Sequence, residues 1–384
     1  MTETIILKGI TWDHSRGYCP MVATAQRFLE THPYVKIEWT KRSLQDFADE
    51  HIDKLAVKYD LLVIDHPWAG YIADTGIILP LNKYLPALFL EDQETHSVGK
   101  SYESYNFDGN QFALAIDAST PVASSRPDLI KKLNISLPRT FEELLELADK
   151  GLVTMPGIPI DTLMNYYMIC CMLGEEPFQG EEFVVSKSTG TKALEMLKDL
   201  ADRLNPEFFN WNPIRVYEAM TTTDNFAYCP WAYGYSNYSK NGYALKILEY
   251  HNLIKDNKDK PYRSTLGGTG LAISANCKHI KIAIEYAMLV ANPTSQSTLY
   301  FDNGGQPGHR KAWEDKDVNE KSANFFKSTL KTLDNAFLRP RYNGYMHFQD
   351  NAGIIIQKYL KNGGNPSQVL FTLNKIYLDS KNSK

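Results

Sequence analysis

The chain has 384 residues, which is too long for one hydrophobic core and predicts about two domains. Its formal net charge is −4 at pH 7, so no basic surplus indicates binding to nucleic acid or to an anionic membrane surface. No run of apolar residues is long enough for a membrane-spanning helix. Length, charge and hydropathy therefore predict a globular protein of two domains without a nucleic-acid partner.

The cysteines give no sign of a disulfide framework or a metal centre. There are five of them, so they cannot all pair. Cys170 and Cys171 are adjacent in an apolar stretch with helical character, and Cys19, Cys229 and Cys277 are too widely separated for the spacing of metal ligands. We expect small buried hydrophobic residues at these positions, and neither a metal nor a cofactor.

The N-terminal part alternates short apolar runs with helical segments. Strands are predicted near residues 5–7, 35–39 and 59–65, and helices over 21–31 and 44–58. Strands of four to seven residues between helices of about a dozen are typical of parallel βαβ units in a doubly wound sheet. The first part of the chain is therefore predicted to be an α/β domain.

The chain then leaves this pattern and later returns to it. A boundary is predicted at 117–120, and the following segment is more helical, with Thr140 as the N-cap of one helix. A polar run over 255–261 indicates an exposed turn. After it, the glycine turn at 267–270 leads into an apolar strand and a helix, which are followed by a second glycine turn at 303–308. Turns of this kind bring backbone close to another group at the end of a sheet.

The order of these segments over residues 4–315 resembles extracellular solute-binding protein family 1, the maltose-binding-protein-like substrate-binding proteins of ABC importers. The resemblance implies a type II periplasmic-binding-protein-like fold, in which each of two lobes is a doubly wound α/β sheet with helices. It places lobe one at 1–117 plus 266–315, lobe two at 121–261 plus 316–384, and the hinge near 117–120, 262–266 and 312–318. Hinge closure around a ligand is the expected motion.

The loop after the first strand carries candidate ligand contacts. Trp12, Asp13, His14 and Arg16 follow that strand and precede a helix whose first turn is predicted to contain Pro20. They offer an aromatic face for stacking and charged groups for orientation, or they form a loop held by local hydrogen bonds. Asp13 and His14 are also the best candidates for acid–base chemistry, but an Asp-His dipeptide is a weak signal.

A second loop follows the third strand. Asp65 either caps the helix that begins near Pro67 or accepts paired hydrogen bonds from vicinal hydroxyls. Trp68 offers a ring face on which the C–H patches of a sugar can pack.

In lobe two, residues 228–238 are the densest aromatic stretch. Proline and glycine interrupt its period, and we predict contacts from Trp231 and Tyr233, with packing under a long loop as the alternative. The remaining candidates lie at the crossing and in the two glycine turns: Asp117, Ser119, Gly268, Thr269, Gly305 and Gln306. The first glycine turn lacks the lysine and spacing of a phosphate-binding loop.

Three functions stay open. The leading one is a monomeric binding protein that captures a small solute, by resemblance a carbohydrate, for ABC transporter permease subunits. A cytoplasmic sensor or scavenger of the same fold is the second, and Arg16, Arg310, Arg339 and Arg341 leave an anionic ligand open. An enzyme using Asp13, His14 or Asp65 is the third. The family points to the periplasm or the exterior, whereas the absence of a leader pattern at residues 1–4 favours the cytoplasm if the chain is the full product.

Overall fold

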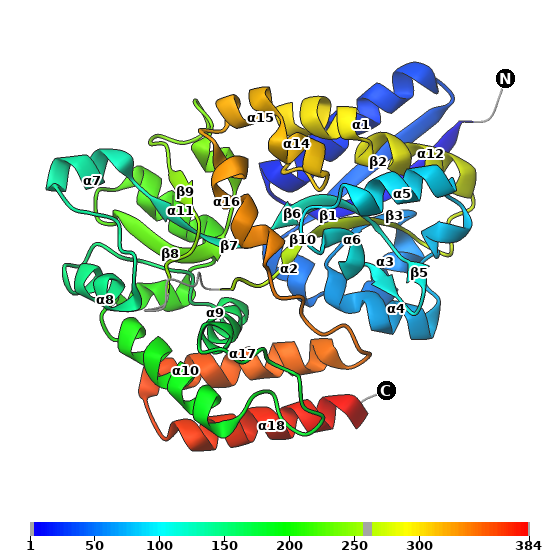
Figure 1. Ribbon diagram of the computed structural model, residues 1–384. Helices are drawn as coiled ribbons and strands as arrows, with labels where there is room; N and C mark the ends of the chain where they lie inside the picture. Colours follow the sequence, from blue (N-terminus) through cyan, green and yellow to red (C-terminus); the bar gives the residue numbers. More distant parts are fainter. Residues whose placement is uncertain (1–3, 256–262, 383–384) are drawn as a thin grey trace. The chain divides into compact units, whose positions relative to one another are not determined.

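The computed structural model describes residues 4–255 and 263–382 (Figure 1). The chain divides into two compact units. Unit 1 comprises residues 1–119, 267–320 and 341–343, and unit 2 comprises residues 120–266, 321–340 and 344–384. Residues 256–261 of the predicted turn at 255–261 lie outside the described residues. Residue 262, the first of the predicted hinge segment 262–266, also lies outside them. Among the described residues, no helix has the length and apolar character needed to cross a membrane.

Unit 1 is built on a five-stranded sheet with the order β2-β1-β3-β10-β6. Strands β1 (Ile5–Trp12), β2 (Val35–Arg42) and β3 (Leu61–Ile64) pair in parallel, and β10 (Gly267–Ile273) pairs antiparallel with both β3 and β6 (Leu114–Ser119). All four residues of β3 are buried, as expected for a central strand covered on both faces. The sheet therefore presents the carboxyl ends of β1, β3 and β6 at one edge.

Helices cover this sheet and complete the core of unit 1. Helix α1 (Ser15–Thr31) contributes Met21 and Phe28, and α12 (Ile280–Ala291) contributes Tyr286 to a core that also contains Leu61 and Leu271. The remaining elements of the unit are α2 (Leu44–Asp49), α3 (Ile52–Lys58), η1 (His66–Trp68), α4 (Ala69–Thr75), η2 (Leu81–Lys83), α5 (Ala87–Thr95), α6 (Ser101–Ser104), β4 (Asn106–Phe107), β5 (Asn110–Gln111), α13 (Pro293–Ser295), η5 (Gln296–Tyr300), α14 (Arg310–Glu314) and α15 (Lys316–Lys321), whose last residue falls in unit 2.

Two predicted helices differ from the structure. Helix α1 begins at Ser15, so Pro20 lies inside it rather than in a helix that starts later. Because Pro20 falls only in the second turn, the hydrogen bond lost at its nitrogen is the one to the carbonyl of Arg16, near the helix start. The single helix predicted over residues 44–58 is two helices, α2 and α3, separated at Glu50 and His51, which both have extended backbone.

Unit 2 combines a small sheet with stacked helices. Strand β7 (Pro121–Ser125) pairs antiparallel with β8 (Tyr228–Tyr233) and β9 (Glu249–His251), so this sheet is not the doubly wound sheet that the resemblance implied for lobe two. Helix α17 (Tyr345–Asn362) packs against α9 (Pro159–Met172) and α18 (Pro366–Asn382), as Figure 1 shows. The other elements are α7 (Pro127–Leu133), α8 (Phe141–Asp149), α10 (Lys187–Ala201), η3 (Pro206–Asn210), α11 (Pro213–Thr222), η4 (Ser236–Ser239) and α16 (Phe325–Asp334).

The predicted cap at Thr140 is confirmed, since its hydroxyl accepts from the backbone N–H of Glu143 at 3.3 Å. The α/β class is likewise confirmed. The predicted lobe boundaries and the hinge between them stay predictions.

Candidate functional site

The carboxyl edge of the unit 1 sheet gathers several of the predicted site residues. Open α/β sheets place ligands at this edge because loops, rather than further strand, follow there. Trp12 is the last residue of β1, Asp65 follows β3, and Asp117 and Ser119 lie at the end of β6. The register pairs Asp117 with Thr269 and Ser119 with Gly267, which brings the first glycine turn to the same edge.

An ion pair joins two of these residues. The Arg16 guanidinium donates from Nε to Asp117 Oδ2 at 2.8 Å and from Nη2 to Oδ1 at 2.5 Å. Both side chains are buried, with 4% and 0% of their surface exposed. Burial raises the pKa of Asp117, and the adjacent Arg16 charge opposes that rise. A bidentate pair of this kind fixes both side chains and cancels their charges.

Backbone irregularity marks the strand opposite Asp117. The register between β10 and β6 shifts between Thr269 and Gly270, which is the signature of a bulge. Gly268 has φ +100°, and a Cβ there would lie 2.3 Å from the carbonyl oxygen of Asp117, so the position requires glycine. Thr269 is 6% exposed, and its Oγ1 has no hydrogen-bond partner within the described part of the chain.

The second glycine turn also reaches this edge, but the side chain of Gln306 in this turn makes hydrogen bonds within the fold. Gln306 is buried, and its side-chain Nε2 donates to the backbone carbonyl of Ala118 at 2.9 Å. The backbone carbonyl of Gln306 accepts from the Ala118 N–H at 3.3 Å. At Gly305 a Cβ would lie 2.3 Å from the Tyr300 ring. These contacts account for both residues structurally, and a role in ligand binding stays a prediction.

The first loop divides its residues between the core and the surface. Trp12 is 3% exposed and packs against Phe47, with ring centroids 5.5 Å apart, so most of its ring is unavailable for stacking on a ligand. Its Nε1 has no acceptor among the residues described. Asp13 is exposed and accepts from Lys41 Nζ at 2.7 Å.

His14 caps helix α1. This agrees with the alternative prediction, in which local hydrogen bonds hold the loop. Its Nδ1 accepts from the backbone N–H of Arg16 at 3.0 Å. Burial, aided by the Arg16 charge, lowers the pKa of His14 to about 4, so the imidazole is neutral at pH 7. An unprotonated cap next to an exposed, ion-paired Asp13 does not form an acid–base pair.

The short helix η1 after β3 is also capped by a side chain. Asp65 accepts from the backbone N–H of His66 at 2.8 Å, which confirms the capping alternative. Trp68 is 8% exposed and contacts His51 and Tyr71 edge to face, with centroids 5.0 Å and 5.7 Å away. Its ring is therefore already surrounded by aromatic neighbours within unit 1.

In unit 2 the predicted aromatic contacts lie on β8. Trp231 is fully buried, whereas Tyr233 is partly exposed and its hydroxyl lies 3.4 Å from Thr265 Oγ1. Tyr217 donates to the carbonyl of Tyr233 at 3.0 Å, so this end of the strand is anchored by a buried phenol. Packing accounts for Trp231, and Tyr233 has the greater freedom to contact a solute.

Sequence reasoning missed Asp161. This carboxyl lies in the first turn of α9 with 4% of the residue exposed, and its Oδ2 has no partner in the described structure. Burial raises the pKa of Asp161 to about 8. It lies near the Cys229 thiol of β8. The signal in the sequence was an acidic residue in the largely apolar stretch 158–164.

Comparison with known proteins identifies the family. Residues 23–326 match the family described as bacterial extracellular solute-binding proteins. The chain belongs to this family. Its fold matches solved structures of maltose-bound MalE3 of T. maritima, with 15% identity, TM-score 0.84 and coverage of 99% of this chain and 100% of that one.

Two further structures resemble this solute-binding protein. An ABC transporter solute-binding protein from Agrobacterium radiobacter in complex with ribitol has 17% identity and TM-score 0.80, with 100% of this chain and 99% of that chain covered. The Thermus thermophilus maltotriose binding protein bound with maltotriose has 18% identity and TM-score 0.79, with coverages of 98% and 100%. These likenesses confirm the expected two-lobed α/β solute-binding fold.

The four arginines that left an anionic ligand open already have hydrogen-bond partners within this solute-binding protein. Arg16 is paired with Asp117, and Arg341 Nη1 donates to the backbone carbonyls of Glu103 and Asn106. Arg310 Nε donates to the carbonyl of Ser97 at 3.2 Å. Arg339 Nη1 donates to Gln349 Oε1 at 2.8 Å. At least one donor of each is thus used within the fold, and the Arg16 charge is cancelled by Asp117, which weakens the case for an anionic ligand.

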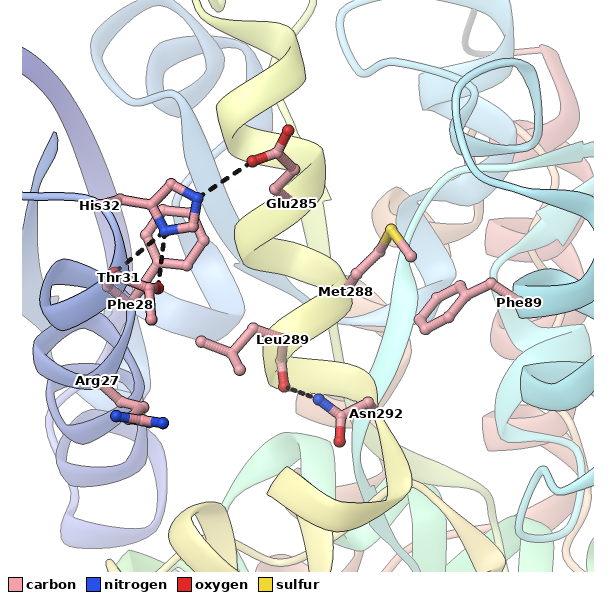
Figure 2. Close-up of a pocket in the computed structure, with 9 residues that line it drawn as sticks. All are labelled: Arg27, Phe28, Thr31, His32, Phe89, Glu285, Met288, Leu289 and Asn292. Atoms are coloured by element: carbon pink, nitrogen blue, oxygen red, sulfur yellow. Dashed lines mark hydrogen bonds and ion pairs between the residues drawn. The ribbon is translucent and has the colours of Figure 1, made fainter. Parts of the chain in front are cut away.

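A groove of about 500 Å³ lies elsewhere on unit 1. Figure 2 shows the His32 ring directed toward Glu285, with its Nε2 3.3 Å from Glu285 Oε2. The groove is formed by α1, α5 and α12, and its lining residues include none of the predicted ones; they are Arg27, Phe28, Thr31, His32, Phe89, Glu285, Met288, Leu289 and Asn292. It is therefore separate from the carboxyl edge of the sheet.

A cluster with metal-ligand chemistry also occurs in unit 1, where the sequence indicated none. Asp92, His96 and His309 each offer one ligand atom, and these atoms lie within 4.8 Å of one another. No predicted site residue belongs to this cluster.

Proposed function

We propose that the protein captures a small neutral carbohydrate or polyol and delivers it to an ABC-type importer. The observation that carries the proposal is a pair of buried polar atoms at the carboxyl edge of the unit 1 sheet that have no partners among the described residues: Trp12 Nε1 and Thr269 Oγ1. Leaving such groups without hydrogen bonds costs free energy, and a ligand with many hydroxyls supplies both donors and acceptors. The chemistry of these atoms suits hydroxyl groups.

The charges argue for neutrality of the ligand. The positive charge of Arg16 is cancelled by the carboxylate of Asp117. Burial raises the pKa of Asp161 to about 8, so this carboxyl is mostly neutral near pH 7. Maltose, maltotriose and ribitol, which are bound in structures of similar fold, are neutral polyhydroxy compounds. A second candidate function is not favoured, because Asp13, His14 and Asp65 are engaged in local hydrogen bonds rather than arranged for a reaction.

The family supports a location in the periplasm or outside the cell, and permease subunits as the partner. We propose that the protein acts there as a monomer. Small-angle scattering should then report a monomer that contracts slightly when solute is added. A dimer, or a monomer whose radius of gyration is unchanged at saturating solute, would refute this part.

Native mass spectrometry of gently purified protein should reveal a co-purified neutral solute. Thermal shift measurements with maltose, maltotriose and ribitol, set against citrate and phosphate, then test the class directly. A solute at 100 times its dissociation constant stabilises the folded state by about 2.7 kcal/mol. A rise in melting temperature with the anions alone would contradict the proposal.

A further inference from the structure

We propose that Asp92, His96 and His309 bind a single Zn²⁺ ion. Two imidazoles and one carboxylate are the ligand types that zinc takes in open sites, where water fills the fourth position. Magnesium and calcium prefer oxygen ligands instead. The cluster lies in unit 1, does not involve the proposed solute contacts, and is independent of the proposed function.

The geometry is close to that of a metal site. His96 Nδ1 lies 2.9 Å from Asp92 Oδ1, and His309 Nε2 lies 3.1 Å from Asp92 Oδ2. With zinc–ligand bonds near 2.0–2.1 Å, two ligands of a tetrahedral ion are about 3.3 Å apart. The two imidazole rings stack at 5.3 Å with an interplanar angle of 20°, so small rotations bring both nitrogens toward one ion.

The backbone holds the three ligands in place. Asp92 and His96 are four residues apart at the C-terminal end of α5, which puts them on one face of the helix. The segment carrying His309 is fixed to them by a β-bridge between Ser97 and His309 and by the Arg310 N–H, which donates to the His96 carbonyl at 2.7 Å. A site formed by rigid backbone does not have to be ordered by the ion.

Access and protonation also suit a metal. The side chains of Asp92 and His96 are 30% and 32% exposed, whereas His309 is 1% exposed, so the cluster opens to solvent on one side. To bind the ion through His96 Nδ1 and His309 Nε2, each neutral ring must carry its proton on the nitrogen that does not bind. At His309 that nitrogen is Nδ1, which then loses the 3.3 Å hydrogen bond that it accepts from the Lys311 N–H.

Lys311 competes with the ion for the same carboxylate. Its Nζ lies 3.4 Å from Asp92 Oδ1, and its side chain is 52% exposed, so it can swing away when a divalent ion arrives. Arg310 is the other nearby cation, and its guanidinium is directed to the Ser97 carbonyl and to Glu314. Removing the Lys311 charge should therefore strengthen metal binding.

Bound zinc would fasten α5 to the segment that carries Gln306. That segment is hydrogen-bonded to Ala118 and Ile116 at the end of β6, where Gly308 N–H donates to the Ile116 carbonyl at 3.1 Å. Zinc would thus reduce opening of this edge of unit 1 and raise the melting temperature of the protein.

Isothermal titration calorimetry with ZnCl₂ tests the site, using protein free of any polyhistidine tag. We expect one ion per chain with a dissociation constant at or below about 10 µM. His96→Ala should weaken binding at least about tenfold, because it removes a ligand while the backbone bond from Arg310 to its carbonyl remains. Lys311→Gln should bind more tightly than the parent.

His51→Ala is the matched control, because His51 is also an exposed histidine beside a carboxylate, with Nδ1 3.0 Å from Asp53 Oδ2. Among the residues that the structure describes, it belongs to no cluster of three possible metal ligands. It should bind zinc like the parent. The proposal is overturned if the parent shows no saturable binding, if His96→Ala binds as the parent does, or if His51→Ala loses the ion.

Discussion

Asp161→Asn should make the protein more stable near neutral pH. The folded state holds the pKa of Asp161 at about 8, against 3.8 for an ordinary aspartate, because the carboxyl is buried. Since the folded pKa is raised, its contribution to stability is complete below about pH 4 and is lost as the pH rises toward 8. At about 1.4 kcal/mol for each pH unit, the loss is at most roughly 4 kcal/mol by pH 7.

Urea unfolding of the parent and Asp161→Asn at pH 4.5 and 7.5 measures this difference. The asparagine has its own packing and hydrogen-bonding cost, but that cost is the same at both pH values and cancels. We expect the variant to gain at least about 2 kcal/mol on the parent between the two pH values. Asp149→Asn, which changes a carboxylate that is 61% exposed in the same unit, should show no such gain.

Equal pH dependence of the parent and Asp161→Asn would refute the reasoning. It would mean that the carboxyl is ionised in the folded protein at pH 7 and that its Oδ2 has a partner.

Three further substitutions test other parts of the site. Arg16→Ala should lower the free energy of unfolding by about 3–5 kcal/mol, because it leaves Asp117 buried without its partner; urea unfolding with no loss would show that the pair is dispensable. Gly268→Ala should cost at least about 1 kcal/mol, since φ is +100° and the Cβ would meet the Asp117 carbonyl; an unchanged melting temperature would contradict the bulge geometry. Tyr233→Ala should weaken solute binding at least about tenfold in calorimetry, because Tyr233 is the partly exposed aromatic of β8, whereas Trp39→Phe in the core of unit 1 should alter stability alone; the reverse pattern would mean that Tyr233 does not contact the solute.

Much of the fold could be predicted because its signals are local. The apolar residues of β3 form a short uninterrupted run, and the acceptor side chains of Asp65 and Thr140 stand immediately before helical segments. Such features depend on neighbours within a few residues. The doubly wound sheet that the resemblance implied for lobe two was wrong for the sheet of unit 2, because strand pairing there joins β7 to segments more than a hundred residues later.

The site was harder to predict because burial and partnership are not local. Arg16 and Asp117 were both named as candidates, but 101 residues separate them and nothing in the sequence pairs them. Trp12 looked like a stacking surface, yet the helix start at Gly17 approaches so closely that a Cβ there would lie 2.3 Å from its ring. Asp161 resembled an ordinary acidic residue in the first turn of a helix until its burial was known.

The position of β10 has a consequence for how the protein is made. It lies between β3 and β6 in the sheet, but the ribosome produces it only after residues 120–266. At about 5–20 residues per second, the nascent chain waits roughly seven to thirty seconds with the facing edges of β3 and β6 unpaired. Unpaired edges are templates for aggregation, so this interval favours chaperone capture. A fragment ending at Ser119 should not fold alone, whereas a short loop from Ser119 to Gly267, which are neighbours in the register, would release unit 1 from that wait.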